Sequence, residues 1–329
     1  MDAVGSNIRI DSRGGAVLRI MPVVNDAINE EWISDKTRFV WDGLARQRLD
    51  KPYIREGGKL RAAGWDEALA LAAEKLKGEP NEIAALAGNL CDAESMKALK
   101  DLMDSLGVKN MDCRQGGGPL GGTERAGYIL NTTINDLEDA DAILLIGANP
   151  RLEAPLVNTR IRKAWISGGT DIGVIGDAAD LTYDYEHIGV GPDDLVKFSK
   201  STKGFINKLK KAKKPVIILG AGALAREDGA QLLRMTGELA KALKVVREGW
   251  NGFNVLHTAA ARVGGLDMGF LPGEGGKSYA QILKAAGNGE IKTVFLLGAD
   301  ELDTSSLKDT FVIYQGLSLI HISEPTRPY

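Results

Sequence analysis

The chain has 329 residues, enough for two α/β domains, and its 44% hydrophobic and 26% charged content is ordinary for a globular protein. A formal net charge of −3 argues against a general nucleic-acid-binding protein, which is normally basic. With only two cysteines and three histidines, a cluster held by four thiolates is excluded, and an intrinsic zinc site is not expected.

Residues 1–55 are predicted to form a small β-rich lobe. Two alternating runs, Asn7–Ile10 and Ala16–Ile20, flank a turn at Gly14-Gly15, and this pattern is typical of a β-hairpin. The N-terminus lacks the basic and apolar regions of a signal peptide, and no apolar run approaches the roughly 20 residues that cross a bilayer. A cytosolic or organelle-matrix location is therefore expected.

Residues 56–190 are predicted to form a first α/β domain. Gly64 begins an amphipathic helix, because the apolar residues that follow recur on one helical face. These residues are Ala68, Leu69, Ala72 and Leu76. Alternation then continues with a strand at Ile83–Ala87, a helix at Ala93–Leu106 and a strand at Val108–Met111.

The most informative stretch of this domain is a βαβ unit. Ala142–Ile146 is a short apolar run without helical period, which predicts a strand buried on both faces. A turn at Gly147–Pro150 leads into a helix whose basic residues Arg160, Arg162 and Lys163 lie toward its C-terminal end. Gly168-Gly169 ends that helix, and Asp171–Ile175 is a second buried strand. Turns at the carboxyl ends of such strands are where open α/β sheets bind ligands.

Residues 191–316 are predicted to form a second α/β domain, with the division near residues 190–215. A helix is expected from Asp193-Asp194 to about Lys211, and the elements that follow alternate again. These are the strand Val216–Leu219, the helix Glu227–Leu243, a strand at Val245–Arg247, the helix Tyr279–Ala286, and the strands Thr293–Leu297 and Phe311–Tyr314. The alternation predicts an α/β fold of doubly wound parallel sheets.

The final segment, Leu317–Tyr329, reads LSLIHISEPTRPY and looks like the translation of a sequencing-library adapter. We expect it to be a non-native tail, and we exclude His321 and Pro325 from every site for that reason. The native reading would then stop at Gly316, and the chain would be a fragment of a longer gene product.

Two turns have the composition of nucleotide-binding loops. Gly147–Pro150 could offer backbone N–H groups to a phosphate, although glycine, asparagine and proline also suit a plain tight turn. Val216–Ala225 matches G-x-G-x-x-A between a strand and a helix, but the nearest acid after a second strand, Glu248, lies beyond the usual spacing of about 20 positions. A tight turn without nucleotide is an equal alternative for this motif.

The remaining motifs favour structural roles. The glycine-rich loop Gln115–Gly122 is not followed by Lys-Ser or Lys-Thr, so it is not a phosphate-binding loop of the NTPase kind. Lys197–Lys214 contains eight lysines and could dock an acidic partner, but a solvated helix face is the commoner explanation. His187 and His257 lie in no recognisable catalytic context, and His257 is expected in a packed helix.

Several segments together resemble the molybdopterin oxidoreductase family, and within it the large iron–sulfur subunits of NADH–quinone oxidoreductase, respiratory complex I. These segments are MDAVGSNIRIDSRGGAVLRIMP, NEEWISDKTRFVWDGLARQRLDKPYIR, GWDEAL, RAGYILNTTINDLEDADAILLIGANPRLEAPLVNTRIRKAW, LTYDYEHIG, FLLGAD and FVIYQG. The resemblance covers residues 1–316, in the molybdopterin oxidoreductase-fold region alone. It implies that residues 1–55 are a degenerate iron–sulfur domain at the start of that fold.

The sequence departs from active molybdenum enzymes of this family at two places. Ser6 stands where a thiolate of a [4Fe–4S] cluster is expected, which implies that this cluster is absent. Glycine, around Gly116, stands where the family places a molybdenum ligand, and the neighbouring Cys113 is not expected to replace it. No catalytic or metal residue is therefore predicted, and the resemblance leaves vestigial pocket turns. These are Gly147, Asn149, Pro150, Gly220, Gly222 and Gly298.

The resemblance implies a non-catalytic scaffold within a subunit that takes part in electron transfer from NADH to quinone. The iron–sulfur clusters of that subunit would lie in a ferredoxin-like domain whose cysteine motifs this sequence lacks. Implied partners are that domain and other peripheral-arm subunits, with no nucleic acid and no direct membrane insertion. The implied location is the cytoplasmic face of a bacterial inner membrane, or the matrix side in mitochondria, as a peripheral part of the complex.

Two alternatives remain open from the sequence. One is a fragment of an active molybdopterin-dependent oxidoreductase with a bound guanine dinucleotide. The other is a free-standing nucleotide-binding α/β module that uses Gly220–Ala225. We also expect the aromatic residues Trp32, Phe39 and Trp41 to dock the N-terminal lobe against the cluster-bearing domain.

Overall fold

The computed structural model describes residues 2–45, 48–121 and 124–317. The chain divides into two units. Unit 1 comprises Met1–Trp41 and Gly118–Val263, and unit 2 comprises Asp42–Gly117 and Gly264–Tyr329. Each unit is built around its own parallel sheet, so the predicted doubly wound α/β class is confirmed.

Unit 1 contains a five-stranded sheet in the order β13-β10-β7-β8-β9, and every neighbouring pair is parallel. The strands are β7 (Ala142–Ile146), β8 (Asp171–Ile175), β9 (Glu186–Gly189), β10 (Pro215–Gly220) and β13 (Phe253–Leu256). All residues of β7, β10 and β13 are buried, which explains their continuous apolar runs.

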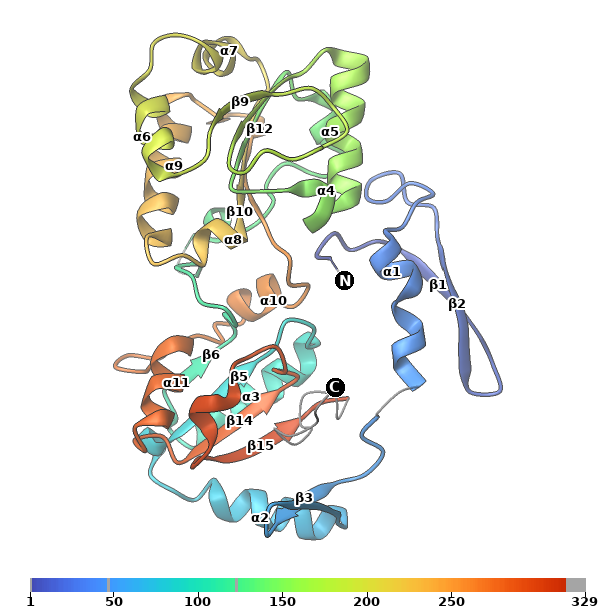
Figure 1. Ribbon diagram of the computed structural model, residues 1–329, viewed down its shortest axis with the longest axis vertical. Coiled ribbons are helices and arrows are strands. Elements are labelled where there is room, and N and C mark those ends of the chain that lie inside the picture. Colours follow the sequence, from blue (N-terminus) through green and yellow to red (C-terminus); the bar gives the residue numbers. More distant parts are fainter. Residues whose placement is uncertain (1, 46–47, 122–123, 318–329) are drawn as a thin grey trace. The chain divides into compact units, whose positions relative to one another are not determined.

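Helices cover both faces of this sheet (Figure 1). Helix α5 (Pro155–Gly168) lies on one face, and α6 (Pro192–Lys200) and α9 (Gly229–Ala242) lie on the other. The smaller elements of unit 1 are α4 (Pro150–Glu153), α7 (Phe205–Lys211), α8 (Ala221–Leu224), the strands β11 (Val246–Arg247) and β12 (Trp250–Asn251), and the 3₁₀ helices η3 (Arg125–Gly127) and η4 (Asn135–Asp139).

The N-terminal lobe of unit 1 contains the predicted hairpin. Strands β1 (Ile8–Arg13) and β2 (Ala16–Pro22) pair antiparallel, and a short helix, α1 (Asp35–Phe39), follows them. Ser34 caps α1, because its hydroxyl accepts a hydrogen bond from the Thr37 N–H. Most hairpin residues are exposed, and the hairpin extends away from the helices of unit 1 (Figure 1).

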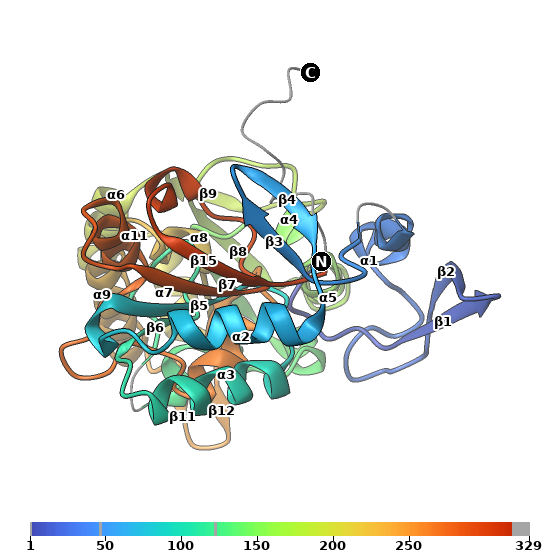
Figure 2. The ribbon, with the colours of Figure 1, turned by 90° about the horizontal axis from the view of Figure 1, so that it is seen from below.

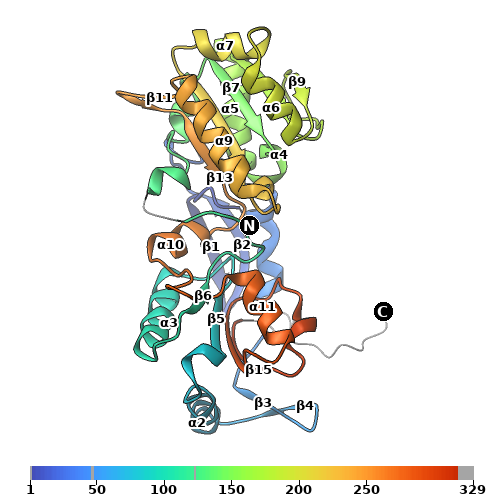
Figure 3. The same ribbon diagram turned by 90° about the vertical axis from the view of Figure 1, so that its left-hand side faces the viewer.

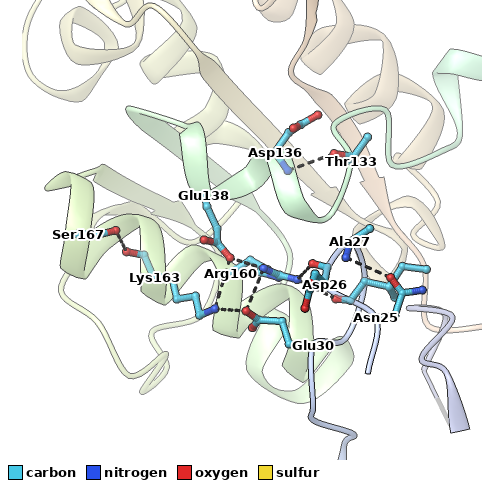
Figure 4. Close-up of polar contacts among 11 residues, drawn as sticks. Asn25, Asp26, Ala27, Glu30, Thr133, Asp136, Glu138, Arg160, Lys163 and Ser167 are labelled. Atoms are coloured by element: carbon cyan, nitrogen blue, oxygen red, sulfur yellow. Dashed lines mark hydrogen bonds and ion pairs between the residues drawn. The ribbon is translucent and has the colours of Figure 1, made fainter. Parts of the chain in front are cut away.

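A buried arginine fastens this lobe to α5 (Figure 4). The Arg160 side chain is only 4% exposed and donates hydrogen bonds to the Glu138 carboxylate and to the Asp26 carbonyl, the latter at 2.5 Å. Glu30 of the lobe lies 3.4 Å from Arg160 and also pairs with Lys163. We expected these basic residues to serve the C-terminal end of the helix, but Arg160 instead lies at its middle and holds two acids from other segments.

Unit 2 contains a four-stranded parallel sheet in the order β15-β14-β5-β6. Its strands are β5 (Ile83–Ala87), β6 (Asn110–Asp112), β14 (Thr293–Leu297) and β15 (Phe311–Gln315). Helix α3 (Ala93–Ser105) lies on one face and α11 (Tyr279–Gly287) on the other (Figure 3). The remaining elements of unit 2 include η2 (Pro80–Glu82) and η5 (Thr304–Leu307), and the division between the units falls within η1 (Val40–Ala45) and α10 (Arg262–Asp267).

An apolar groove of about 670 Å³ lies in unit 2 beside the edge strand β15. It is lined by β15, by α2 (Trp65–Lys75) and by the hairpin of β3 (Tyr53–Glu56) and β4 (Lys59–Ala62) (Figure 2). On the predicted apolar face, Leu76 at the C-cap of α2 is buried and Ala68 and Ala72 are half-buried, whereas Leu69 is 59% exposed. Trp65 at the start of the helix is 69% exposed. The described residues of unit 2 therefore cover this face of α2 only in part.

The sheet memberships correct the predicted division into consecutive domains at 56–190 and 191–316. Strand β7 from the first predicted domain pairs with β10 from the second, and β5 likewise pairs with β14. Within each sheet, later strands pair on the open side of the first strand. The units are interleaved because Gly118–Val263 is inserted between β6 and β14 of the unit 2 sheet. The alternation of elements along the chain cannot reveal which strands pair.

Several predicted element boundaries also need correction. The helix expected from Asp193 to Lys211 is two helices, because Ser201–Gly204 interrupts it and Gly204 has a φ of +74°. The segment around His257 was expected to be helical, but β13 ends one residue before it. The predicted strand near Val245 belongs to the small β11–β12 hairpin, which lies outside the main sheet. The predicted non-native tail lies, apart from Leu317, outside the described residues.

Among the described residues, no helix is both long enough and apolar enough to cross a membrane.

Candidate functional site

The candidate site at the carboxyl ends of the unit 1 strands is a cavity of about 410 Å³. Residues that follow β7, β8 and β9 line it, so it lies at the carboxyl ends of the parallel strands. The chain order of the sheet reverses between β7 and β10, and such a switch point is where open α/β sheets bind ligands. The predicted turn after β7 therefore does reach a cavity.

The glycines at this switch point allow two turns to touch. Gly147 has a φ of +53°, and a side chain there would place its Cβ 2.6 Å from the Cβ of Ala223. A Cβ on Gly220 would lie 2.0 Å from the carbonyl oxygen of Gly147. Close backbone packing therefore explains both glycines without any ligand.

The next residues form a short capped turn. Asn149 is the N-cap of α4, and its Oδ1 accepts a hydrogen bond of 3.2 Å from the Leu152 N–H. Pro150 begins the helix, where its missing N–H costs nothing. The Asn149 N–H donates to Glu153 Oε1 at 2.6 Å, so this backbone donor is bonded to a carboxylate of the chain itself.

Three charged residues line the cavity, Glu153, Asp177 and Arg226. Burial raises the pKa of Glu153 above its ordinary value. The Arg226 guanidinium donates to both carboxylate oxygens of Asp228, at 2.7 and 3.0 Å, so its charge is already paired. The cavity therefore presents two acids and one neutralised base.

This arrangement does not fit the diphosphate of a pterin dinucleotide at the turn. A diphosphate needs free N–H donors or unpaired cations, whereas the Asn149 donor holds Glu153 and Arg226 holds Asp228. A carboxylate already at the turn would repel a second anion.

The predicted pocket residues are dispersed. Gly147 and Asn149 line the cavity, while Pro150 is buried and Gly220 packs behind Gly147. A Cβ on Gly222 would meet open space, and its neighbour Ala223 lines the cavity. Gly298 belongs to unit 2, where it packs beside Cys91.

Of the residues near the expected metal position, Cys113 is packed within unit 2, whereas Gly116 is exposed. Cys113 is buried, and its Sγ lies 2.8 Å from where a Cβ of Gly265 would stand. Gly116 has a φ of +90°, which favours glycine for conformational reasons. Within the described ranges, no group of three or more histidine, cysteine or acidic side chains has the arrangement of a metal site.

The two histidines and the lysine-rich segment have structural contacts. The Nε2 of His257 lies 2.5 Å from the Tyr128 carbonyl oxygen, and burial lowers the pKa of this imidazole. The Nε2 of His187 lies 2.8 Å from the carbonyl oxygen of Gly176. In the lysine-rich segment, Lys208 pairs with Asp171 at 2.8 Å, as expected for a solvated face that carries ion pairs.

Sequence patterns did not indicate the charged residues of the cavity. Asp177 lies two residues after the end of a strand predicted to be buried, so the carboxyl-end rule could have identified it. Glu153 gave only the weak signal of an acid in the first turn of a helix. Arg226 directly follows the glycine motif Gly220–Ala225 and precedes the helix that we predicted from Glu227. The sequence pattern therefore assigned it to neither element, whereas the structure has the short helix α8 within the motif.

Comparisons with known proteins agree with the α/β fold described above. Residues 48–318 match the family model described as molybdopterin oxidoreductase, and residues 1–42 match that described as NADH-ubiquinone oxidoreductase NDSU1/NuoG-like, 4Fe-4S domain. The acetylene hydratase of Pelobacter acetylenicus superposes with a TM-score of 0.64 over 95% of this chain and 59% of its own. Its sequence identity is 12%, so this likeness concerns the fold alone.

Curated relatives cover 96% of this chain. The NADH dehydrogenase (ubiquinone) iron–sulfur protein 1 of Solanum tuberosum mitochondria is 48% identical, and the NADH-quinone oxidoreductase G-subunit of Rickettsia bellii is 44% identical. The mitochondrial NADH-ubiquinone oxidoreductase 78 kDa subunit of Candida albicans is also 44% identical. The chain spans 42–45% of the length of these relatives. The resemblance to the large iron–sulfur subunits of NADH–quinone oxidoreductase is thus confirmed.

Proposed function

Because this chain belongs to the molybdopterin oxidoreductase family, we propose that it is a structural, non-catalytic member of that family. It forms the α/β region of a large iron–sulfur subunit of NADH–quinone oxidoreductase. The parent subunit takes part in electron transfer from NADH to quinone, and this region positions its neighbours without carrying electrons itself. Identity of 44–48% with relatives of those names supports the assignment.

The observation that carries the proposal is the lack of cysteine in the segment that matches an iron–sulfur domain. Residues 1–42 match a 4Fe-4S model, yet the cysteines of the sequence are Cys91 and Cys113. Four thiolates hold such a cluster, so this segment matches the domain in sequence but lacks the cysteines that would hold one. Clusters of the parent subunit would then be bound outside this sequence.

The predicted partners follow from the parent complex. They are the cluster-bearing ferredoxin-like domain and other peripheral-arm subunits. The location is the cytoplasmic face of the bacterial inner membrane, or the matrix side in mitochondria. No nucleic acid and no membrane insertion is involved.

The N-terminal lobe is the surface that we propose docks the cluster-bearing domain. Trp32 and Phe39 are 55% and 62% exposed, and Ile10 and Leu18 of the hairpin are exposed as well. A two-stranded hairpin is marginally stable by itself in water, so an apolar partner would stabilise it. Large exposed apolar residues grouped on one small lobe are typical of an interaction surface.

Metal analysis of the purified chain tests the non-catalytic assignment. We expect neither molybdenum, tungsten nor iron in stoichiometric amount. Stoichiometric molybdenum or tungsten would instead support an active molybdopterin enzyme, and a retained iron–sulfur absorbance would contradict the cluster-free lobe.

Assembly of the parent complex tests the docking surface. Alanine at Trp32, Phe39 and Trp41 should reduce incorporation of the subunit into the complex. The matched control is Ile166→Ala on α5, which removes a side chain that is 62% exposed in unit 1 but outside the lobe. Equal incorporation of both variants would reject the lobe as the docking surface.

A further inference from the structure

The cavity of unit 1 contains an acid that does not belong to the sheet or to its packing. Glu153 ends the four-residue helix α4, and its side chain turns back so that Oε1 accepts the Asn149 N–H at 2.6 Å. The residue is half-buried and lines the cavity. A buried carboxylate is unfavourable unless it is hydrogen-bonded, and here a backbone N–H provides that bond.

The backbone donors around this turn are largely engaged by the chain itself. The Gly147 N–H donates to the Ile175 carbonyl at 2.8 Å, and the Glu153 N–H donates to the Asn149 carbonyl at 2.9 Å. Leu152 donates to both oxygens of Asn149, and Pro150 has no N–H. A loop that binds phosphate instead directs its N–H groups toward the ligand.

The charges around the cavity also disfavour the binding of a phosphate. Asp177 adds a second acid to the lining, and the paired Arg226 offers little compensation. Lys36, whose Nζ donates to the Leu152 carbonyl at 2.5 Å, partly offsets the effect of burial on the pKa of Glu153. It lies outside the cavity lining, so it does not supply an anion site there.

We propose that Glu153 is a built-in anion that occupies the ligand-facing donor of the β7 turn and makes the cavity exclude phosphate-bearing ligands. In this role Glu153 determines specificity: the cavity admits uncharged or cationic molecules and rejects nucleotides and dinucleotides. Charge selection is set by residues within unit 1 and is independent of the complex to which the chain belongs.

Removal of the carboxylate tests this role by chemical rescue. Glu153→Ala vacates the position and frees the Asn149 N–H, so the variant should unfold at a lower temperature than the wild type. Formate, the smallest carboxylate, should restore part of that loss at constant ionic strength and leave the wild type unchanged. Glu238→Ala on α9 is the control, because Glu238 is 65% exposed and pairs with Arg234 on the helix surface. It should show no formate effect.

Calorimetry with guanosine and guanosine diphosphate tests the exclusion itself. Glu153→Ala should bind the diphosphate at least tenfold more tightly than the wild type, whose binding should be weak. Guanosine, which has no charge, should bind the wild type and the variant equally. Glu153→Gln keeps the acceptor but removes the charge, so it should show a smaller gain and serves as the test variant if the alanine variant fails to fold.

Two results would overturn the proposal. One is binding of guanosine diphosphate by the wild type as tightly as by the variants, and the other is a lack of any gain in either variant. The metal content of the protein has no bearing on these outcomes, so they are separable from the test of the non-catalytic assignment.

Discussion

The two sheets meet the same geometrical problem at their switch points and solve it in the same way. In unit 1 a Cβ on Gly220 would lie 2.0 Å from the Gly147 carbonyl, and in unit 2 a Cβ on Gly88 would lie 1.8 Å from the Gly298 carbonyl. The side chains above the crossings differ. A cavity opens beside the crossing of unit 1, whereas the Cys91 thiol lies over that of unit 2 and donates to the Leu297 carbonyl at 2.9 Å.

The comparison shows that glycine at a switch point reports backbone packing and by itself carries no information on ligands. The two crossings share this requirement although their surroundings differ. What the cavity of unit 1 accepts depends on non-glycine side chains such as Glu153. A glycine motif therefore identifies a crossing of two turns, and only its neighbours can identify a site.

Unit 1 carries an N-terminal lobe that Arg160 holds against α5. Removing the contacts of Arg160 with Glu30 and Glu138 should have the largest effect on the free energy of unfolding. Arg160→Ala leaves Glu30 and Glu138 without their buried partner, which should lower the free energy of unfolding by about 3 kcal/mol. Chemical denaturation would measure the loss. Lys163→Ala removes a base that is 41% exposed and should cost less than about 1 kcal/mol. Similar losses in both variants would contradict a special role for the buried arginine.

Replacing a crossing glycine with alanine tests the close backbone contact that both sheets share. Gly220→Ala and Gly88→Ala should each destabilise the protein by roughly 1–3 kcal/mol, because the new Cβ meets backbone that cannot move aside. Gly222→Ala lies in the same motif as Gly220 but faces open space, and it should stay within about 0.5 kcal/mol of the wild type. Thermal unfolding of the three variants would compare them. A harmless Gly220→Ala would show that the crossing tolerates a side chain.

The Cys91 thiol above the crossing of unit 2 should contribute less to the free energy of unfolding than the glycines of the crossings do. Cys91→Ala removes a half-buried donor and leaves a small gap, so a loss of about 1 kcal/mol is expected. Cys91→Ser keeps a donor at the same position and should recover part of this loss. Burial raises the pKa of Cys91, so alkylation at neutral pH should be slower than for a free thiol. Rapid alkylation of the folded protein would argue against the contact.

The smallest expected effect is that of His257, which follows the edge strand β13 of the unit 1 sheet. It appears only as a pH dependence of the free energy of unfolding. Burial lowers the pKa of His257, so the folded state binds this proton less readily than the unfolded state, whose value is near 6.5. The resulting stability is present above about pH 6.5 and is lost as the pH falls from there toward the lowered pKa. His257→Asn should flatten that slope in denaturation curves taken across this range. An unchanged slope would assign the pH dependence to other groups.

Much of the fold was predictable because buried parallel strands have a strong local signal. The runs at Ala142–Ile146, Ile83–Ala87 and Thr293–Leu297 are strands, as predicted, and all of their residues are buried. The failures arose where tertiary context decided the outcome. Phe253–Leu256 is too short and too close to other apolar residues to be distinguished from a helix, and the interleaving of the units depends on pairings that no local pattern encodes.

The sequence predicted where the candidate site lies but not which hydrogen bonds and charges it contains. The carboxyl-end rule placed Gly147 and Asn149 at a cavity, whereas the hydrogen bond from Asn149 to Glu153 depends on a side-chain rotamer that the sequence does not determine. The predicted role of Gly220 as a pocket turn remains a prediction, because the contact with Gly147 explains this glycine without a ligand. Fold patterns therefore indicate where to look, while the electrostatics of the site require coordinates.

The interleaving of the two units also constrains how the polypeptide matures on the ribosome. The first 41 residues emerge early but belong with residues 118–263, and Asp42–Gly117 must wait for the strands near the end of the chain. Neither sheet can be completed while its later strands are still unsynthesised, so nascent chains expose unpaired strand edges for longer than a consecutive arrangement would allow. Chaperone dependence during synthesis is the expected result for this topology.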